Sequence, residues 1–218
     1  MRAGLIFDLD GVLTDTEEYH FRSWRKLAEE LGVPFTRATS QALRGRSRPD
    51  ALELFLAGRR PGTGREELLE RKNRYFLEQI ESLGPEDLAP GIARLFDQAE
   101  CREIPLGLAS SSRNARLVCR RLGILERFTA FVDGCSTLRP KPAPDMFLWA
   151  AGRLGLDPGC CTVVEDSEAG VQAALTGGFL VVGVGPGERV GAAHTVFADL
   201  AEATVDDLCR PVARGASR

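Results

Sequence analysis

The chain has 218 residues, a formal net charge of −3 and a hydrophobic content of 44%. This length suffices for one large hydrophobic core or two smaller domains. The balanced charge argues against a nucleic-acid-binding protein and against a membrane-surface protein, so we expect neither partner. Residues 1–4 lead directly into a short apolar strand, which fits neither a secretion signal nor a membrane span.

The six cysteines predict a reducing compartment, because none of them forms a Cys-x-x-Cys motif or joins a histidine cluster. Cys101 and Cys119 fall in apolar helical patterns, where we expect buried free thiols. Trp24 and Trp149 occupy similar helical patterns and are expected in the core. His194 lies in a glycine- and alanine-rich loop, and we expect it at the surface without a partner. These features together favour a cytoplasmic protein.

The first predicted element is an apolar strand that begins at residue 5 and ends in two aspartates and a glycine. Asp8 and Asp10 are two residues apart, so they project from the same face of a strand. Gly11 allows the chain to turn sharply away. Taken alone, an Asp-x-Asp-Gly sequence is more often a solvated turn than a functional site. The other strand ends must therefore decide between these two interpretations.

Residues 16–89 show helical periodicity and no strand signal. Apolar residues recur at helical spacing in three stretches, which contain Trp24, Phe55 and Phe76 respectively. Glycine and proline follow each stretch and predict its end. A loop rich in arginine, residues 44–49, separates the first stretch from the second. We therefore predict a helical module inserted between the first strand and the rest of the chain.

From residue 90 onward, predicted helices and strands alternate. We expect strands over 104–109, 131–133, 162–164 and 179–184, with helices over 92–99, 114–122, 145–154 and up to 176. Such alternation predicts βαβ units and a parallel sheet, and continuous apolar runs predict strands covered on both faces. Residues 1–15 and 90–218 should thus form one three-layer, Rossmann-like α/β core. The small, basic tail over 209–218 is expected to fray.

Polar residues follow three further predicted strands. Ser110 begins a serine-rich segment before a helix, where serines either cap the helix or help to bind an anion such as phosphate. Lys141 lies in a proline-rich loop that restricts its direction, although a single lysine is usually solvated. Glu165 and Asp166 directly follow a buried apolar run.

Parallel-sheet geometry brings these strand ends to one edge of the sheet. The two acidic pairs would then crowd one crevice, where two carboxylates about 4 Å apart repel by roughly 4 kcal/mol at an effective dielectric of about 20. Such a group needs cations, and hard oxygen ligands with room for phosphate and water favour Mg²⁺. Phosphoryl transfer is the reaction that this combination indicates, since it needs carboxylates, a cation, a lysine such as Lys141 and a segment that binds an anion.

The four strand-end segments resemble, in order and spacing, the four motifs of the haloacid dehalogenase superfamily of phosphotransferases. These segments cover residues 8–11, 108–110, 141–142 and 165–166. The helical module over 16–89 is similar to the mobile helical cap of that superfamily. The resemblance implies that Asp8 is the nucleophile and that Asp10 is the general acid and base. It also implies that Ser110 and Lys141 hold the transferring phosphate.

The resemblance further implies a magnesium site and a substrate site. Mg²⁺ would be held by Asp8, by Asp10 through its backbone carbonyl and by Asp166, with Glu165 close by. The implied substrate contacts are Thr16, His20, Arg44, Arg48, Lys72, Ser112, Arg113 and Asn114. Within this set, Arg48, Ser112 and Asn114 would bind the distal phosphate. His20 and Lys72 would serve closure of the cap and contact with the substrate.

Several of these residues admit a second interpretation from the sequence alone. Position 72 lies on the apolar stripe of its helix, so Lys72 either reaches solvent or lines a cleft beneath the cap. A single helical histidine such as His20 is more often structural than functional. The arginines within 44–48 either form a solvated face or bind phosphate, for which the paired donors of a guanidinium are suited.

Residues 14–22, 43–48, 71–73 and 141–145 are most similar to the sugar-phosphate mutases of the superfamily. This similarity implies that phospho-Asp8 donates to β-glucose 1-phosphate and that the 1,6-bisphosphate then returns a phosphoryl group, leaving glucose 6-phosphate. A sugar-phosphate phosphatase is the alternative, because the core motifs are shared and only the cap discriminates. A catalytically silent binding protein is disfavoured because Asp8 and Lys141 are both present. We expect a monomer that binds a small sugar phosphate.

Overall fold

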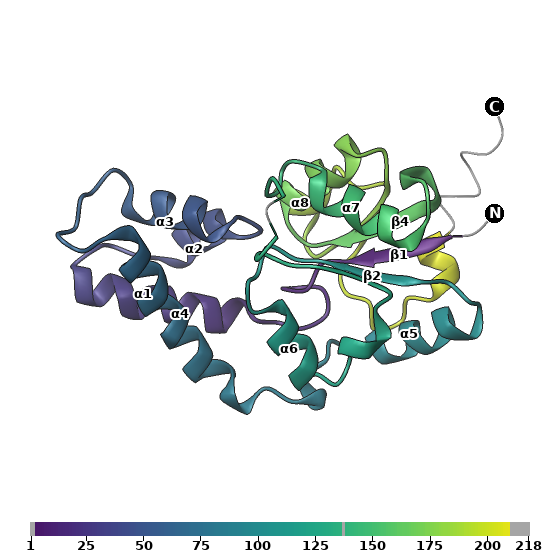
Figure 1. The fold of residues 1–218 in the computed structure, drawn as a ribbon, viewed down its shortest axis with the longest axis horizontal. Helices are drawn as coiled ribbons and strands as arrows, with labels where there is room; N and C mark the ends of the chain where they lie inside the picture. The colour runs from purple at the N-terminus through teal and green to yellow at the C-terminus, as the bar shows by residue number, and fades with distance from the viewer. Residues whose placement is uncertain (1–2, 137, 210–218) are drawn as a thin grey trace.

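A parallel sheet forms the centre of the computed structural model, which describes residues 3–136 and 138–209 (Figure 1). Its six strands are β1 (Gly4–Phe7), β2 (Leu106–Ala109), β3 (Ala130–Val132), β4 (Cys161–Glu165), β5 (Leu180–Val184) and β6 (Thr195–Phe197). Their order across the sheet is β3-β2-β1-β4-β5-β6, and every pair is parallel. The central position of β1 therefore puts its carboxyl end beside those of β2 and β4.

Helices cover both faces of this sheet (Figure 1), as the continuous apolar runs predict. On one face lie α5 (Ile92–Cys101) and α6 (Ala115–Arg121), and on the other lie α7 (Asp145–Leu154) and α8 (Glu168–Thr176). The shorter helices are α9 (Gly187–Val190), η1 (Ile80–Ser82), η2 (Pro85–Asp87), η3 (Leu125–Arg127) and η4 (Pro158–Cys160). The predicted three-layer α/β core is confirmed.

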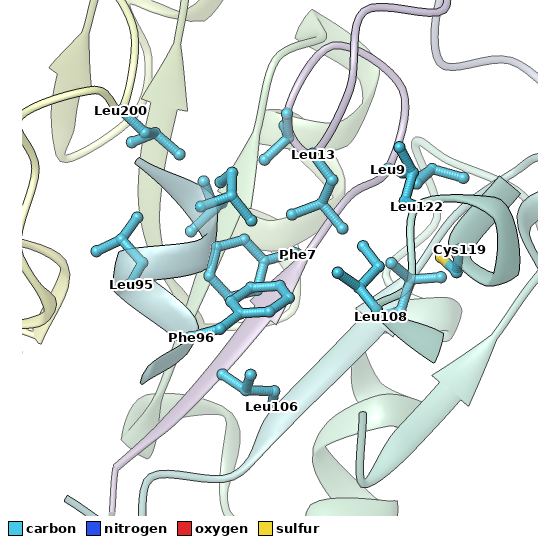
Figure 2. Packing of buried hydrophobic residues seen from close by; sticks show 14 of the residues in the cluster. Phe7, Leu9, Leu13, Leu95, Phe96, Leu106, Leu108, Cys119, Leu122 and Leu200 are labelled. Carbon is cyan, nitrogen blue, oxygen red and sulfur yellow. The ribbon is translucent and has the colours of Figure 1, made fainter. Parts of the chain in front are cut away.

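Alternate residues of β1 enter two separate hydrophobic clusters. Phe7 packs toward α5, where its ring centroid lies 5.3 Å from that of Phe96 in an edge-on arrangement (Figure 2). Ile6 points to the opposite face and joins the cluster that contains Phe147 of α7. Each such burial stabilises the fold by about 1.5–3 kcal/mol, so β1 is anchored from both sides. The position of the two aspartates that follow β1 is therefore fixed by the core.

Four helices lie between β1 and α5 in the sequence and form a separate module beyond the carboxyl end of β1 (Figure 1). They are α1 (Glu17–Leu31), α2 (Arg37–Leu43), α3 (Arg48–Leu56) and α4 (Arg65–Gln79). The module has its own cluster of buried side chains, which includes Trp24, Phe55 and Leu68. An inserted helical module is thus present, and its limits at residues 16 and 89 stay a prediction.

The ends of α1 and α3 follow from local sequence. Glu17 and Glu18 lie in the first turn of α1, where acidic groups interact favourably with the helix dipole. The helix ends at Gly32, whose φ of 62° is left-handed. The Ser47 hydroxyl accepts a hydrogen bond from the backbone of Asp50, so α3 begins at Arg48 rather than after the predicted loop over 44–49.

Three expectations about single residues are wrong. Trp149 is 38% exposed, because α7 buries the neighbouring positions 146, 147, 150 and 151 instead. Cys101 is exposed at the last position of α5, whereas Cys119 is buried as expected. His194 is exposed but does have a partner, because its Nδ1 accepts a hydrogen bond from the backbone of Val181.

Several short elements, among them α2, α9 and β6, are absent from the sequence-based expectations. Residues 210–218 of the tail expected to fray lie outside the described part of the chain. Across residues 3–136 and 138–209, no helix has both the length and the apolar character needed to cross a membrane.

Candidate active site

The carboxyl ends of three strands meet at one point of the sheet edge. Asp8 directly follows β1, and its backbone N–H donates to the carbonyl of Val164 in β4, at 2.9 Å. Ser110 directly follows β2. Glu165 is the last residue of β4, and Asp166 comes next. The structure therefore brings together side chains that the sequence separates by more than a hundred positions.

Lys141 is buried and pairs with the first aspartate. Its Nζ donates to Oδ1 of Asp8 at 2.5 Å and lies 3.6 Å from Oε1 of Glu165. Burial alone would lower the pKa of Lys141, but the two carboxylates raise it above its ordinary value. Lys141 is therefore a fixed positive charge at the strand ends and not a solvated surface lysine.

The carboxylate of Asp10 contacts residues of the helical module. Its Oδ1 accepts a hydrogen bond from the hydroxyl of Thr16 and lies 3.8 Å from Nε2 of His20. Burial would raise the pKa of Asp10, but these contacts outweigh it and lower the pKa below its ordinary value. Asp10 thus lines the same cavity as Asp8 and Asp166, but its carboxylate is not part of the buried acidic group formed by Asp8, Glu165 and Asp166. The role of its backbone carbonyl as a metal ligand stays a prediction.

His20 and Lys72 form a pair inside the cleft beneath the module. Nζ of Lys72 lies 2.7 Å from Nδ1 of His20, and the His20 ring stacks on Phe76 with a centroid distance of 4.3 Å. Lys72 is only 9% exposed, so of the two interpretations the structure supports the cleft and not solvent. Burial, aided by the charge of Arg48, lowers the pKa of Lys72 to about 7.

Replacing Lys72 by methionine should stabilise the fold near neutral pH. In the unfolded chain the lysine keeps its ordinary pKa of 10.5, so between pH 7 and 10.5 the unfolded state binds more protons and stability rises with pH. Removing the buried charge is expected to raise the unfolding free energy at pH 7 by about 4 kcal/mol. Urea unfolding at pH 7 and pH 10 measures this gain, which should shrink at the higher pH.

The exposed Lys26 offers a matched control on the same module. A Lys26→Met variant should show no such dependence of the gain on pH. Equal gains at both pH values for Lys72→Met would contradict the proposed cost of its buried charge.

Asp8, Glu165 and Asp166 form a buried acidic group whose oxygens fit a metal ion. Each residue offers one oxygen, and these atoms lie within 4.8 Å of one another. Burial raises the pKa of Glu165 to about 8 and that of Asp166 to about 7, so a cation is needed to keep all three ionised. Oδ2 of Asp166 is buried and accepts no hydrogen bond from the described residues. These hard oxygen donors suit Mg²⁺.

Glu165 is held in place by the first turn of α8. Its Oε1 accepts from the hydroxyl of Ser167 at 2.8 Å, and its Oε2 accepts from the backbone of Asp166 at 3.2 Å. The carboxyl group packs so closely on Gly170 that a side chain there would clash with it. Ser167 also caps α8 through the backbone of Gly170, so the helix and the acidic group position each other.

The serine-rich segment after β2 differs from the expected helix start. Ser110 Oγ accepts from the backbone of Ser112, and Ser112 Oγ accepts from the backbone of Asn114. Helix α6 begins only at Ala115 and has no side-chain cap. The serines therefore form turns and do not cap the helix. Contact of Ser110 and Ser112 with phosphate stays a prediction.

Besides the contacts of Asp10 with Thr16 and His20, three further residues take part in polar contacts that join the helical module to the strand ends. Arg44, in the loop between α2 and α3, forms ion pairs with Asp166 and with Glu17. The Ser111 hydroxyl donates to the carbonyl of Gly45 at 3.1 Å. The Asn114 amide donates to Oδ1 of Asn73 in α4 at 2.9 Å. Asn114 therefore bonds to the module in this structure, which the sequence does not predict.

Arg48 and Arg113 place two positive charges near each other. Burial and the guanidinium of Arg113 both lower the pKa of Arg48. Within the described residues neither arginine forms an ion pair with a carboxylate, and Arg113 bonds instead to the carbonyl of Gly134. Two like charges without an acidic partner are suited to an anion such as phosphate.

A cavity of about 120 Å³ lies between the module and the strand ends. Its lining includes the predicted residues Asp8, Asp10, Thr16, His20, Arg44, Arg48, Lys72, Ser112 and Asp166. Glu17 and Ser111 also line it and were not predicted, although each lies next to a predicted residue. The other predicted residues are outside this lining, namely Ser110, Arg113, Asn114, Lys141 and Glu165.

Comparisons with known proteins agree with this geometry. The model of the haloacid dehalogenase-like hydrolase family matches residues 3–178. The β-phosphoglucomutase of Bacillus subtilis is 44% identical over 209 residues, which cover 94% of this chain and 92% of that protein. The fructose-1-phosphate phosphatase YqaB of Escherichia coli is 33% identical over 186 residues, covering 84% and 96% respectively. The crystal structure of a β-phosphoglucomutase from Clostridium difficile superposes with a TM-score of 0.94 at 31% identity, with both chains fully covered.

Proposed function

This chain belongs to the haloacid dehalogenase-like hydrolase family. Within that family, we propose that it is a Mg²⁺-dependent β-phosphoglucomutase. The enzyme would interconvert β-D-glucose 1-phosphate and glucose 6-phosphate through an aspartyl phosphate and a 1,6-bisphosphate. One observation carries the proposal: the Thr16 hydroxyl, from the start of the module, bonds to Asp10 beside the nucleophile Asp8. The similarity to the Bacillus subtilis mutase spans the module as well as the core.

Phosphoryl transfer would begin at Asp8. A carboxylate oxygen of Asp8 attacks the phosphorus of the bisphosphate, and the bond from phosphorus to the sugar oxygen breaks. Asp10 gives its proton to that leaving oxygen, so charge is balanced as glucose phosphate departs. Lys141 lies within hydrogen-bonding distance of Asp8 and would stabilise the negative charge on the transferring group.

The second half of the cycle reverses these roles. Asp10 takes the proton from a hydroxyl of β-glucose 1-phosphate, and the sugar oxygen attacks the phosphorus of phospho-Asp8. The bond between that phosphorus and Asp8 breaks, which frees the carboxylate and gives the 1,6-bisphosphate. Bound Mg²⁺, held by Asp8, the Asp10 carbonyl and Asp166 with Glu165 close by, would supply charge neutralisation. The module must exclude water, because water attacking phospho-Asp8 would make the enzyme a phosphatase.

The distal phosphate would lie between Arg48 and Arg113. Both guanidinium groups lack a carboxylate partner in the described residues, and Arg48 lines the cavity. Ser112 and Asn114 would add hydrogen bonds, for which Asn114 must release Asn73. His20 and Lys72, paired beside Asp10, would contact the sugar.

Three further features belong to the same proposal. The module over 16–89 would act as the mobile cap of the core formed by 1–15 and 90–218. The enzyme would work as a monomer on a small sugar phosphate, with neither nucleic acid nor a membrane as a partner. All six cysteines are free, which supports a reducing compartment such as the cytoplasm.

A single assay separates the mutase from the phosphatase. The enzyme is given β-glucose 1-phosphate, Mg²⁺ and a trace of the 1,6-bisphosphate, and both glucose 6-phosphate and free phosphate are measured. We expect glucose 6-phosphate with little free phosphate, and no turnover of the α anomer as a control. Release of one phosphate for each sugar consumed would refute the mutase and support the phosphatase.

A further inference from the structure

Arg44 places its guanidinium on a carboxylate that the proposed metal site requires. Nη2 of Arg44 contacts Oδ2 of Asp166, and Nη1 contacts Oε2 of Glu17. The Asp166 side chain is 2% exposed and that of Arg44 is 16% exposed, so bulk water screens this contact little. Arg44 is the one residue of the module that pairs with the acidic group in the described part of the chain.

The contact with Asp166 is an attraction between charges and not a well-aligned hydrogen bond. Oδ2 of Asp166 accepts no hydrogen bond of normal geometry from the described residues. The other nearby cation, Arg189, has its Nη2 at 3.9 Å and uses its Nε to bond the backbone carbonyl of Asp166 at 2.6 Å. The lone pairs of Oδ2 therefore remain available to a ligand with better geometry.

The backbone of Gly11 packs tightly against the contact between Arg44 and Asp166. Gly11, with a φ of +85°, lies so close that a side chain there would clash with both Asp166 Oδ2 and Arg44 Nη2. A divalent ion repels a guanidinium twice as strongly as another single charge would at the same distance. Arg44 and Mg²⁺ would therefore oppose each other at this carboxylate.

We propose that Arg44 is an internal competitor for the metal, which occupies Asp166 until Mg²⁺ displaces it. Glu17 then keeps the displaced guanidinium at the cavity, which all three side chains line. The protein therefore binds Mg²⁺ more weakly than the same acidic group would without Arg44. The reason is that only those molecules in which Asp166 is free of Arg44 can bind the ion. This proposal rests on the metal site of the proposed function.

Isothermal titration of Mg²⁺ into the full-length protein tests the competition without measuring activity. For Arg44→Gln, we expect the Kd for Mg²⁺ to fall at least about tenfold, which corresponds to about 1.4 kcal/mol. Arg46→Gln is the matched control, since Arg46 is an exposed arginine in the same loop that bonds to the Ala42 carbonyl. Its effect should stay within about twofold, because exposed charges are screened.

A second pair of variants tests the proposal through a change of the Kd for Mg²⁺ in the opposite direction. Glu17→Gln removes the alternative partner of Arg44, so the guanidinium stays on Asp166 and the Kd for Mg²⁺ should rise several-fold. Glu18→Gln is the control, because Glu18 lies next in the same helix and pairs with Arg22 and Arg37 instead. Circular dichroism checks that all four variants are folded.

The outcomes separate this proposal from the proposed function. An unchanged or higher Kd for Arg44→Gln, or a fall no greater than that of Arg46→Gln, would overturn the competition while leaving the metal site intact. An Asp166→Asn variant that binds Mg²⁺ as tightly as the natural protein would overturn the metal site and the competition together.

Discussion

An Asp8→Asn variant is expected to lose turnover by about 10⁴-fold or more, because the amide cannot attack phosphorus. The fold should survive, since Lys141 keeps a carboxylate neighbour in Glu165 at 3.6 Å. Steady-state conversion of β-glucose 1-phosphate measures the loss. Intact-mass measurement after addition of the 1,6-bisphosphate should show the phosphorylated enzyme for the natural chain only.

Asp97→Asn is the control for this variant. Asp97 is an exposed carboxylate that pairs with Arg127 on the far side of the core from the cavity, so its loss should leave turnover and phosphorylation unchanged. Full activity in Asp8→Asn would remove the basis of the whole mechanism.

Replacing Asp10 by asparagine should lower kcat by about 10²- to 10⁴-fold, the usual contribution of a general acid and base. The amide can still accept the hydrogen bond from Thr16, so the geometry at the start of the module should persist. A small acyl phosphate has a leaving group that needs no proton. It should therefore still phosphorylate Asp8 in Asp10→Asn, and intact mass detects this.

Asp15→Asn is the matched control, because Asp15 is an exposed acid in the same segment whose carboxylate accepts from the backbone of Glu17. An equal loss of kcat in both variants would show that the segment is merely sensitive to lost charge. Failure of the acyl phosphate to phosphorylate Asp10→Asn would contradict a role limited to proton transfer, because this leaving group needs no proton.

The meeting of the strand ends could be predicted because its causes are local. The apolar run before Asp8 and the run before Glu165 are each continuous, which predicts buried strands that are parallel to one another. In the structure Phe7 lies opposite Val164, one residue before each acidic segment. Proximity of the first and fourth segments therefore follows from sheet geometry once the strands are recognised.

The partners of the site residues could not be predicted, because they depend on how the module packs on the core. The sequence does not indicate that Asp10 turns toward His20, nor that Arg44 reaches Asp166. Each of these contacts joins the module to the core. Periodicity likewise shows which stripe of a helix is apolar but not how much of that stripe other elements cover. For this reason it wrongly predicts that Trp149 lies in the core.

The short elements escaped prediction for a different reason. Strand β6 has three residues, and its central Val196 is exposed, so no buried run marks it. Helix α2 has seven residues and buries only Leu43. Elements of this length lack a full period of apolar residues, and their structure comes from neighbours in the fold.

Helix α4 belongs to two hydrophobic cores at once. Leu68, near its start, is buried in the cluster of the module, whereas Phe76 and the following Ile80 are buried in the cluster beneath the sheet. Unfolding of either cluster would remove apolar contacts from the same helix. The module and the core therefore form one cooperative folding unit, and a fragment limited to the four helices would expose the end of α4 that is buried in the core cluster.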